Sequence, residues 1–358
     1  MDRGDMRPSG ARPVVVRVPV EPVEAAVEAD AVDAVARAGD VAVRGPLFGV
    51  ATQGAGDGPR WRVMVPVTSG CPQMARDSLN SKLWFRAKDE AGDRAERRAL
   101  LAAVARLESE RVDELTVGTT RYRVVRAEEY AALGAHGIEP PRPTDPEPPA
   151  PDWNRSPRIP RVDDGLLLDP DAPVTPTQAL EQLALRTLAY RGERFPEDVR
   201  EDSLRALDTH PDVLLLPATF AVVERTGGGW KPVNGPHVSA HEARKSLDFC
   251  LTWAWPRMRG LIPVDTDVEA DARSVAAGGG PSAAELAPYA EASERLRAGR
   301  RVNRLELGDT VYQIGRTRRL LRWGPDGPEG PRPSDTDSHD PERIHLGLDE
   351  DGNVIPED

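Results

Sequence analysis

Two histidines four residues apart, His237 and His241, suggest chemistry because imidazole rings at this spacing can share a zinc ion on one helix face. The local sequence favours a different interpretation. Ser239 and Glu242 have the spacing of a capping box that begins a helix, so His237 precedes that helix. The order of residues also differs from the His-Glu-x-x-His motif. We therefore predict a helix start here, with no metal site and no cofactor.

The thiol of Cys71 is the next candidate, because the sequence places it at the start of a helix, where the helix dipole can lower a thiol pKa. A nucleophilic thiol also needs a general base, and His136, the histidine of the first half, falls in a predicted loop. Cys71 and Cys250, the two cysteines, show neither metal-binding nor redox spacing. We predict a partly buried residue and no catalytic thiol.

A dense basic and aromatic cluster follows late in the chain. It consists of Arg316, Arg318, Arg319, Arg322 and Trp323. Such a cluster can bind a phosphate or stack on a nucleotide base. Alternation along a strand with an exposed polar face gives the same pattern. Both interpretations stay open.

The strongest signal in the sequence is an internal repeat. Residues 111–145 and 301–335 align without a gap, with about 14 of 35 positions identical where chance gives roughly two or three. Upstream, the motif Ala-Arg-x-Ser-Leu at 75–79 recurs at 243–247. The repeat predicts a tandem duplication and a pseudo-two-fold, two-lobed architecture whose lobes face each other or share an edge.

Hydrophobic periodicity predicts the elements of each half. In the first half it indicates a helix over 23–37, strands over 41–51 and 61–67, helices from Pro72 and around Leu100, and strands over 114–117 and 121–126. Gly118 and Gly308 fit tight hairpin turns that need a positive φ. We predict an α+β fold in which each half is a helix, a hairpin, two helices and a second hairpin, with antiparallel sheets and helices packed on one side.

Composition divides the chain into five segments. These are a disordered tail (1–22), a first α+β repeat (23–145), a Pro-rich linker (146–176), a second α+β repeat (177–335) and an acidic, solvated tail (336–358). Most of the net charge of −12 falls in the linker and the acidic tail, which leaves the repeats close to neutral. Nucleic-acid binding requires a basic face, so the charge pattern argues against it. No apolar run is long enough for a membrane span.

Polar residues at equivalent repeat positions form a candidate set for function. They are Arg76/Arg244, Ser78/Ser246, Tyr122/Tyr312, Arg126/Arg316, Arg142/Arg332 and Asp145/Asp335. The set holds no general base, and we expect an Arg–Asp pair to fix each Pro-Arg-Pro segment against the sheet. For a ligand or partner site we select Arg76, Arg244, Trp84, Trp253, Trp255, Tyr122, Tyr312, Arg126, Arg316 and Trp323.

Several longer motifs resemble one family. They lie at 45–49 (GPLFG), 69–76 (SGCPQMAR), 83–88 (LWFRAK), 246–249, 257–262 and 322–335. With these motifs, the chain resembles an uncharacterised family of Streptomyces and related actinobacteria, catalogued only as a domain of unknown function. The resemblance covers nearly all residues after the N-terminal tail. It implies an actinobacterial, cytoplasmic protein and implies no activity.

These observations predict a non-catalytic intracellular binding or regulatory protein. An unknown protein or small molecule would bind where the two repeats meet. The alternative is an enzyme with its active site in the cleft between the lobes and one degenerate half. A third interpretation is a structural component that forms homo-oligomers. A deep pocket with a perturbed Cys, His or acid would favour the enzyme, and a shallow aromatic surface would favour the binding protein.

Overall fold

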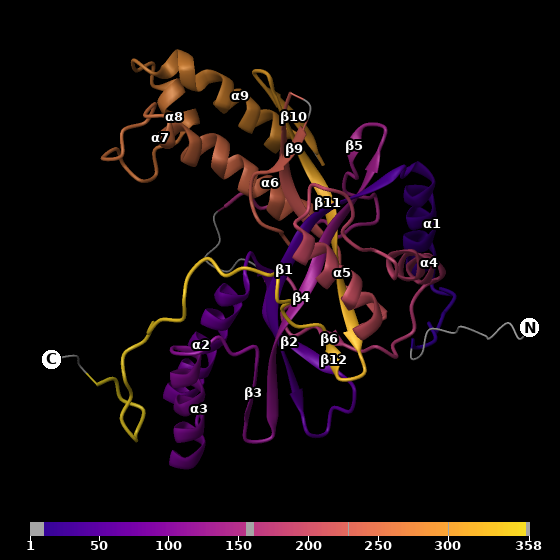
Figure 1. Cartoon of the computed structure of the whole chain (residues 1–358). Helices are drawn as coiled ribbons and strands as arrows, with labels where there is room; N and C mark the ends of the chain where they lie inside the picture. The colour runs from indigo at the N-terminus through magenta and orange to yellow at the C-terminus, as the bar shows by residue number, and fades with distance from the viewer. Residues whose placement is uncertain (1–10, 155–160, 228, 300, 356–358) are drawn as a thin grey trace, which may run out of the picture.

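The structure is a computed structural model that describes residues 11–154, 161–227, 229–299 and 301–355. It is an α+β fold built on one curled antiparallel sheet of 12 strands, which forms a half-barrel. Figure 1 shows helices α2 and α3 beside one end of the sheet, α6, α8 and α9 beside the other end, and α1 next to α4 on the opposite flank. The predicted α+β class is confirmed.

The elements follow in chain order. The first half contains α1 (Pro22–Arg37), β1 (Asp40–Gly54), β2 (Trp61–Ser69), α2 (Pro72–Asp89), α3 (Arg94–Leu107), β3 (Glu114–Val117), β4 (Thr120–Gly134) and β5 (Gly137–Ile138). The second half contains β6 (Leu167–Leu168), α4 (Pro176–Leu185), α5 (Glu197–Thr209), β7 (Asp212–Leu215), β8 (Thr219–Thr226), β9 (Gly229–Pro232) and α6 (Ala240–Phe249). It continues with the π-helical turn η1 (Cys250–Ala254), α7 (Trp255–Met258), α8 (Ala272–Ala277), α9 (Ala283–Ala298), β10 (Arg304–Leu307), β11 (Thr310–Gly324) and β12 (Gly327–Pro328).

The predicted hairpins of both halves form. Gly118 and Gly308 adopt positive φ values of 58° and 57° at the two turns, as a tight hairpin requires. Strand β4 is longer than the predicted 121–126, because it continues through charged residues that hydrophobic alternation does not mark. Ion pairs satisfy these buried charges, so the strand tolerates them inside the protein.

Strands β4 and β11 join the two halves at the centre of the sheet. The strand order is β6-β2-β1-β4-β11-β8-β9. In the β4–β11 pair, Glu129 lies opposite Arg319 and Tyr130 opposite Arg318. Glu129 and Arg319 are also equivalent positions of the sequence repeat, which are offset by 190 residues. The halves therefore share one continuous sheet.

Four apolar cores of the described residues pack around the shared sheet, and the smallest joins Leu185 to Tyr130, Val213 and Leu320. One packs β1 and β4 against α2 and α3 through residues such as Phe48 and Tyr122. A second packs β8 and β11 against α6 and α9. The third lies inside the curl of the sheet, where Trp61 and Trp323 are both 1% exposed. Because the curled sheet covers this core itself, the prediction of helices packed on one side describes only part of the packing.

Each half extends an arm onto the other half. The first arm (residues 137–154) follows β4, and the second arm (residues 327–355) follows β11. Arg126 Nε binds Asp335 Oδ2 at 2.9 Å, whereas Arg316 Nε binds Asp145 Oδ2 at 3.1 Å. The expected Arg–Asp pairs are therefore present, but each joins a strand of one half to the arm of the other.

Further contacts repeat this exchange. Arg76 binds Asp337 of the second arm, and Arg244 binds Glu147 of the first arm. At the helices, Asp30 of α1 accepts the Thr144 amide, and Asp202 of α5 accepts the Ser334 amide. In the second half α5 therefore makes the contact that α1 makes in the first.

The second arm also includes most of the predicted acidic tail. Figure 1 shows its final stretch, in yellow, beside α2 and α3. Trp84 Nε1 donates to the Leu346 carbonyl at 2.9 Å, His345 stacks on the Trp84 ring, and Leu348 joins the core under these helices. Most residues of this segment are exposed, as a solvated end would be, but Trp84, His345 and Leu348 attach it to α2 and α3.

Deleting residues 339–358 should lower the free energy of unfolding by about 3 kcal/mol. Burial of a leucine such as Leu348 contributes about 1.5–3 kcal/mol, and the Trp84 hydrogen bond about 1 kcal/mol. Urea unfolding followed by tryptophan fluorescence measures the change. Leu348→Ser should reproduce much of the loss. Ile344→Ser, at a 38% exposed position, should change stability by less than about 0.5 kcal/mol. Equal stability of the deletion variant and the full chain would contradict the packing of the second arm against α2 and α3.

Candidate functional site

Two cavities meet at the centre of the sheet. The chamber, about 470 Å³, lies between residues 12–15, residues 166–174, α4 and β7. The groove, about 490 Å³, lies between α1 and α4 above β4. Gln178, Arg316 and Arg318 line both. Arg316 and Arg318 reach this position together because they are two residues apart on β11 and share one face of the strand.

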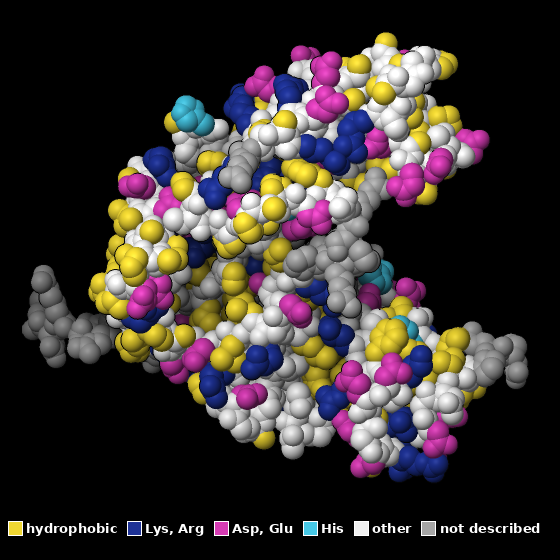
Figure 2. Space-filling model, turned by 180° about the vertical axis from the view of Figure 1, so that it is seen from behind, with side chains coloured by type: hydrophobic (Ala, Val, Ile, Leu, Met, Phe, Trp, Pro, Cys, Tyr) yellow, Lys and Arg dark blue, Asp and Glu magenta, His cyan; other side chains and the backbone are white. Residues whose placement is uncertain are grey.

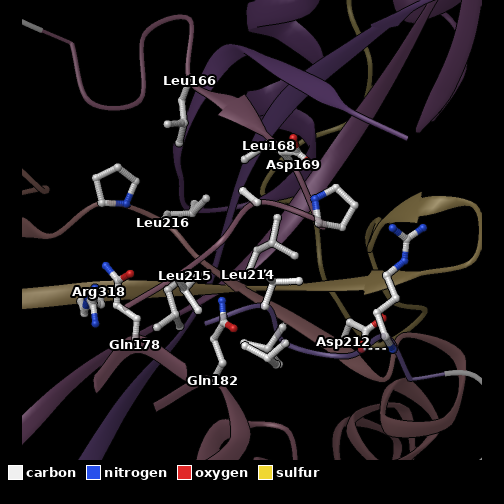
Figure 3. Close-up of a pocket in the computed structure, with 18 of the residues that line it drawn as sticks. Leu166, Leu168, Asp169, Gln178, Gln182, Asp212, Leu214, Leu215, Leu216 and Arg318 are labelled. Carbon is white, nitrogen blue, oxygen red and sulfur yellow. Dashed lines mark hydrogen bonds between the residues drawn. The ribbon is translucent and has the colours of Figure 1, made fainter. Parts of the chain in front are cut away.

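The chamber has polar ends and an apolar middle. Figure 3 shows Arg318 and Gln178 at one end and Asp212 at the other, with Leu214 and Leu215 between them. Arg186 lies at the Asp212 end, because its guanidinium binds the Asp212 carboxylate at 3.1 Å. A chamber of this kind can hold a small molecule by its apolar body and orient it by its polar groups.

Three arginines that line the chamber have buried N–H groups without a partner. Arg186 Nε, Arg316 Nη1 and Arg318 Nε make no hydrogen bond among the described residues. Arg316 is 7% exposed. Buried donors without an acceptor are rare and cost free energy, so three at one cavity require a physical explanation.

The other atoms of these arginines are well paired. Arg316 Nε binds Asp145, and Arg318 binds Glu181, which also accepts from the Tyr130 hydroxyl. Burial lowers the pKa of Arg316 below its usual value, although Asp145 opposes this effect. Burial raises the pKa of Asp212 above its usual range. Arg316 therefore holds its charge at a cost that an additional acceptor would reduce.

The structure places the sequence-selected residues in separate environments. Arg76, on α2, contacts Asp113 and Asp337, and Arg244, on α6, contacts Glu147 and Asn303. Of the ten residues, Arg316 alone lines both the chamber and the groove. Its repeat partner Arg126 binds Glu128 and Asp335. The set is therefore not brought together as one site.

The aromatic residues of the selected set lie mostly in the cores. Tyr122 is buried and its hydroxyl accepts from Arg86, Tyr312 packs against Trp255 with ring centroids 4.9 Å apart, and Trp323 lies inside the curl of the sheet. Trp84 lies beneath the second arm. Trp253 donates to the Val268 carbonyl and stacks on Phe249. Figure 2 shows a notch between the helices of the two halves.

Cys71 gains neighbours that the sequence did not predict. Its thiol contacts the Ser338 hydroxyl at 3.2 Å, Ser338 contacts His339 Nδ1, and His339 Nε2 contacts Asp77. Burial acts to raise the pKa of the Cys71 thiol, but hydrogen bonds involving Ser338 and Met74 outweigh it and lower that pKa. Cys71 is 6% exposed and contacts a hydroxyl rather than the imidazole. This chain of contacts joins the second arm to α2.

The histidine pair begins a helix, as predicted. The Ser239 side chain accepts the Glu242 amide and caps α6, while His241 Nε2 contacts the Asp152 carbonyl. Among the described residues, no group of three or more His, Cys, Asp or Glu side chains could hold a metal ion. No helix in the described part of the chain has the length and apolar character needed to cross a membrane.

Sequence reasoning missed the chamber residues outside β11. Gln178 and Gln182 lie on α4, Arg186 is the residue that follows this helix, and Asp212 begins β7. One feature of the sequence could have indicated these residues. Between the linker and α5 the second half carries α4, a helix that is additional to the pattern of the first half. Thr175 and Gln178 form a capping box. Gln178 is therefore explained by its role at the start of the helix, and the sequence gives no separate reason to assign it to a site.

The chain belongs to a family of unknown function, DUF5954, whose profile matches residues 21–338. No curated protein and no solved structure matches the chain. The argument for function therefore depends on the geometry of the chamber and the groove.

Proposed function

We propose that this DUF5954 protein is a non-catalytic binding protein that holds a small molecule with oxygen acceptors in the chamber. The observation that carries the proposal is the set of three buried, unpartnered N–H groups of Arg186, Arg316 and Arg318 around one cavity. A carboxylate or phosphate oxygen is the strongest acceptor for a guanidinium. A bound acceptor would therefore offset the cost of these buried donors.

The lining of the chamber favours binding over catalysis. Its described residues include no histidine and no cysteine, and Asp212 already accepts from Arg186 and from the Arg12 amide. A general base needs an acceptor position that is available to the substrate. The alternative of an enzyme in the cleft between the lobes therefore has less support than a binding site at Arg316 and Arg318.

We further propose that the two halves arose by tandem duplication and that the site lies where they interlock. The support is the reciprocal set of contacts, in which Arg126–Asp335 matches Arg316–Asp145 at a constant offset of 190 residues. The opposition of Glu129 and Arg319 would put the pseudo-two-fold axis between these two residues. Superposition of residues 114–145 on 304–335 in an experimental structure tests this, and different arm paths would contradict it.

Titration of the full chain with acetate, or with inorganic phosphate, at constant ionic strength tests the binding proposal. At ten times its dissociation constant, a ligand should stabilise the protein by about 1.4 kcal/mol, measured as a rise in the thermal midpoint. Arg316→Gln combined with Asp145→Asn should abolish the rise. Changing both partners avoids leaving a buried charge without its pair.

The chain supplies a matched control. Arg126→Gln with Asp335→Asn removes the equivalent ion pair of the other half, and Arg126 lines neither the chamber nor the groove. This variant should keep the response to acetate or phosphate. An equal response in both double variants, or no response in the unmodified protein, would refute the proposed site.

A further inference from the structure

The groove between α1 and α4 has aliphatic walls that the proposed function does not use. Val27 and Val35 of α1 lie across from Leu180 and Ala184 of α4. Val27 is 45% exposed, Val35 58% and Leu180 70%. Exposed aliphatic side chains on two neighbouring helices are a feature of ligand grooves rather than of an ordinary surface.

The floor of the groove is polar, because Arg316 and Arg318 line it as well as the chamber. The carboxylates that line the groove already accept hydrogen bonds within the protein: Glu28 from Thr177, Glu139 from Arg142, and Glu181 from Tyr130 and Arg318. Arg316 Nη1 lies 4.0 Å from Glu139, beyond hydrogen-bond distance. Arg316 Nη1 and Arg318 Nε therefore lack an acceptor among the described residues, although both arginines line the groove.

We infer that the ligand is an amphipathic monocarboxylic acid. Its carboxylate lies at the end of the chamber that Arg316 and Arg318 line, where it accepts hydrogen bonds from Arg316 Nη1 and Arg318 Nε. Its apolar chain extends from there into the groove between α1 and α4. The inference rests on the proposed function and specifies its ligand class. The chain of the acid covers the exposed walls, and the groove volume of about 490 Å³ falls within the usual range for small-molecule pockets, about 300–1,000 Å³.

Calorimetric titration of the full chain with butyrate, hexanoate, octanoate and decanoate, each below its micelle concentration, tests the inference. Each methylene buried in the groove should strengthen binding about four-fold. Ala184→Trp should remove this dependence, because the indole fills the groove without contacting the chamber. Leu183→Trp is the matched control, since Leu183 is 48% exposed on the same helix and does not line the groove, and it should keep the dependence.

The outcomes separate the inference from the proposed function. Acids that all bind equally, whatever their chain length, would overturn the groove assignment and leave the acceptor site at Arg316 intact. Equal chain-length dependence in Ala184→Trp and the unmodified protein would also overturn it. Binding of octan-1-ol as tight as that of octanoate would overturn the carboxylate assignment. Failure of every acid to bind, with inorganic phosphate still raising the thermal midpoint, would overturn the carboxylate assignment alone. Failure of both the acids and phosphate would refute the proposed function itself.

Discussion

Asp163→Asn should lower the free energy of unfolding by about 3–5 kcal/mol, although it replaces only one carboxylate oxygen by an amide nitrogen. Asp163 and Arg319 form an ion pair in which both side chains are 0% exposed. The substitution leaves the Arg319 charge buried without its counter-ion, a situation that costs about this much. Asparagine tolerates the positive φ of 58° at this position, so the backbone is not the cause of the expected loss. Urea unfolding of the full chain measures the effect.

Two further variants isolate the buried charge as the cause. Adding Arg319→Met to Asp163→Asn should recover part of the stability, because the unpaired charge is removed. Glu306→Gln breaks an exposed pair with Arg304, whose side chains are 52% and 64% exposed, and should cost less than about 1 kcal/mol. The account is contradicted if Asp163→Asn is no more destabilising than Glu306→Gln.

Gly49→Ala should destabilise the protein by about 3 kcal/mol, because the new methyl group would enter the backbone of β2. An added Cβ would lie 2.6 Å from the Val65 carbonyl oxygen and 2.8 Å from that of Pro66. The β1–β2 pairing has a register shift at this glycine, as expected for a β-bulge. Backbone atoms cannot rotate away as a side chain can, so the strands must separate. The thermal or urea midpoint reports the loss.

Gly56→Ala provides the comparison for Gly49→Ala. A Cβ at Gly56 meets nothing within 4 Å. Its φ lies outside the left-handed region, so alanine should be accepted with a change below about 0.5 kcal/mol. Similar stabilities of the two variants would show that β1 and β2 do not approach each other as closely as the structure indicates.

Local sequence signals predicted much of the fold. Strand β3 begins and ends at the predicted residues, α1 begins one residue before its predicted start, and the turn glycines have the expected conformation. These features depend on periodicity, capping and turn chemistry, which act over a few residues. The domain bounds at 145, 176 and 335 stay predictions.

The exchange of the arms could not be predicted, for a physical reason. Both halves carry the same Arg and Asp motif, so Arg126 could pair equally well with Asp145 or Asp335 as far as the sequence shows. The choice depends on the path of the chain after β4. The docking of the second arm was hidden similarly, because His345, Leu346 and Leu348 are too few to produce a periodic pattern among acidic neighbours.

The sequence named two residues that line both cavities: Arg316, which was selected for a site, and Arg318, which was named in the basic and aromatic cluster. The remaining lining residues come from segments that are far apart in sequence, namely residues 12–15, α1, α4 and β7. Only the folded chain brings them together. The prediction that function depends on where the halves meet or differ fits the proposed site, which combines β11 at the junction with α4.

The most direct test of the central claim is an anomalous-scattering crystal structure of the full chain with decanoate that carries a terminal bromine. The account predicts the carboxylate within hydrogen-bond distance of Arg316 Nη1 and the bromine signal between α1 and α4. A bromine signal elsewhere, or only solvent beside Arg316 and Arg318 at saturating ligand, would contradict it.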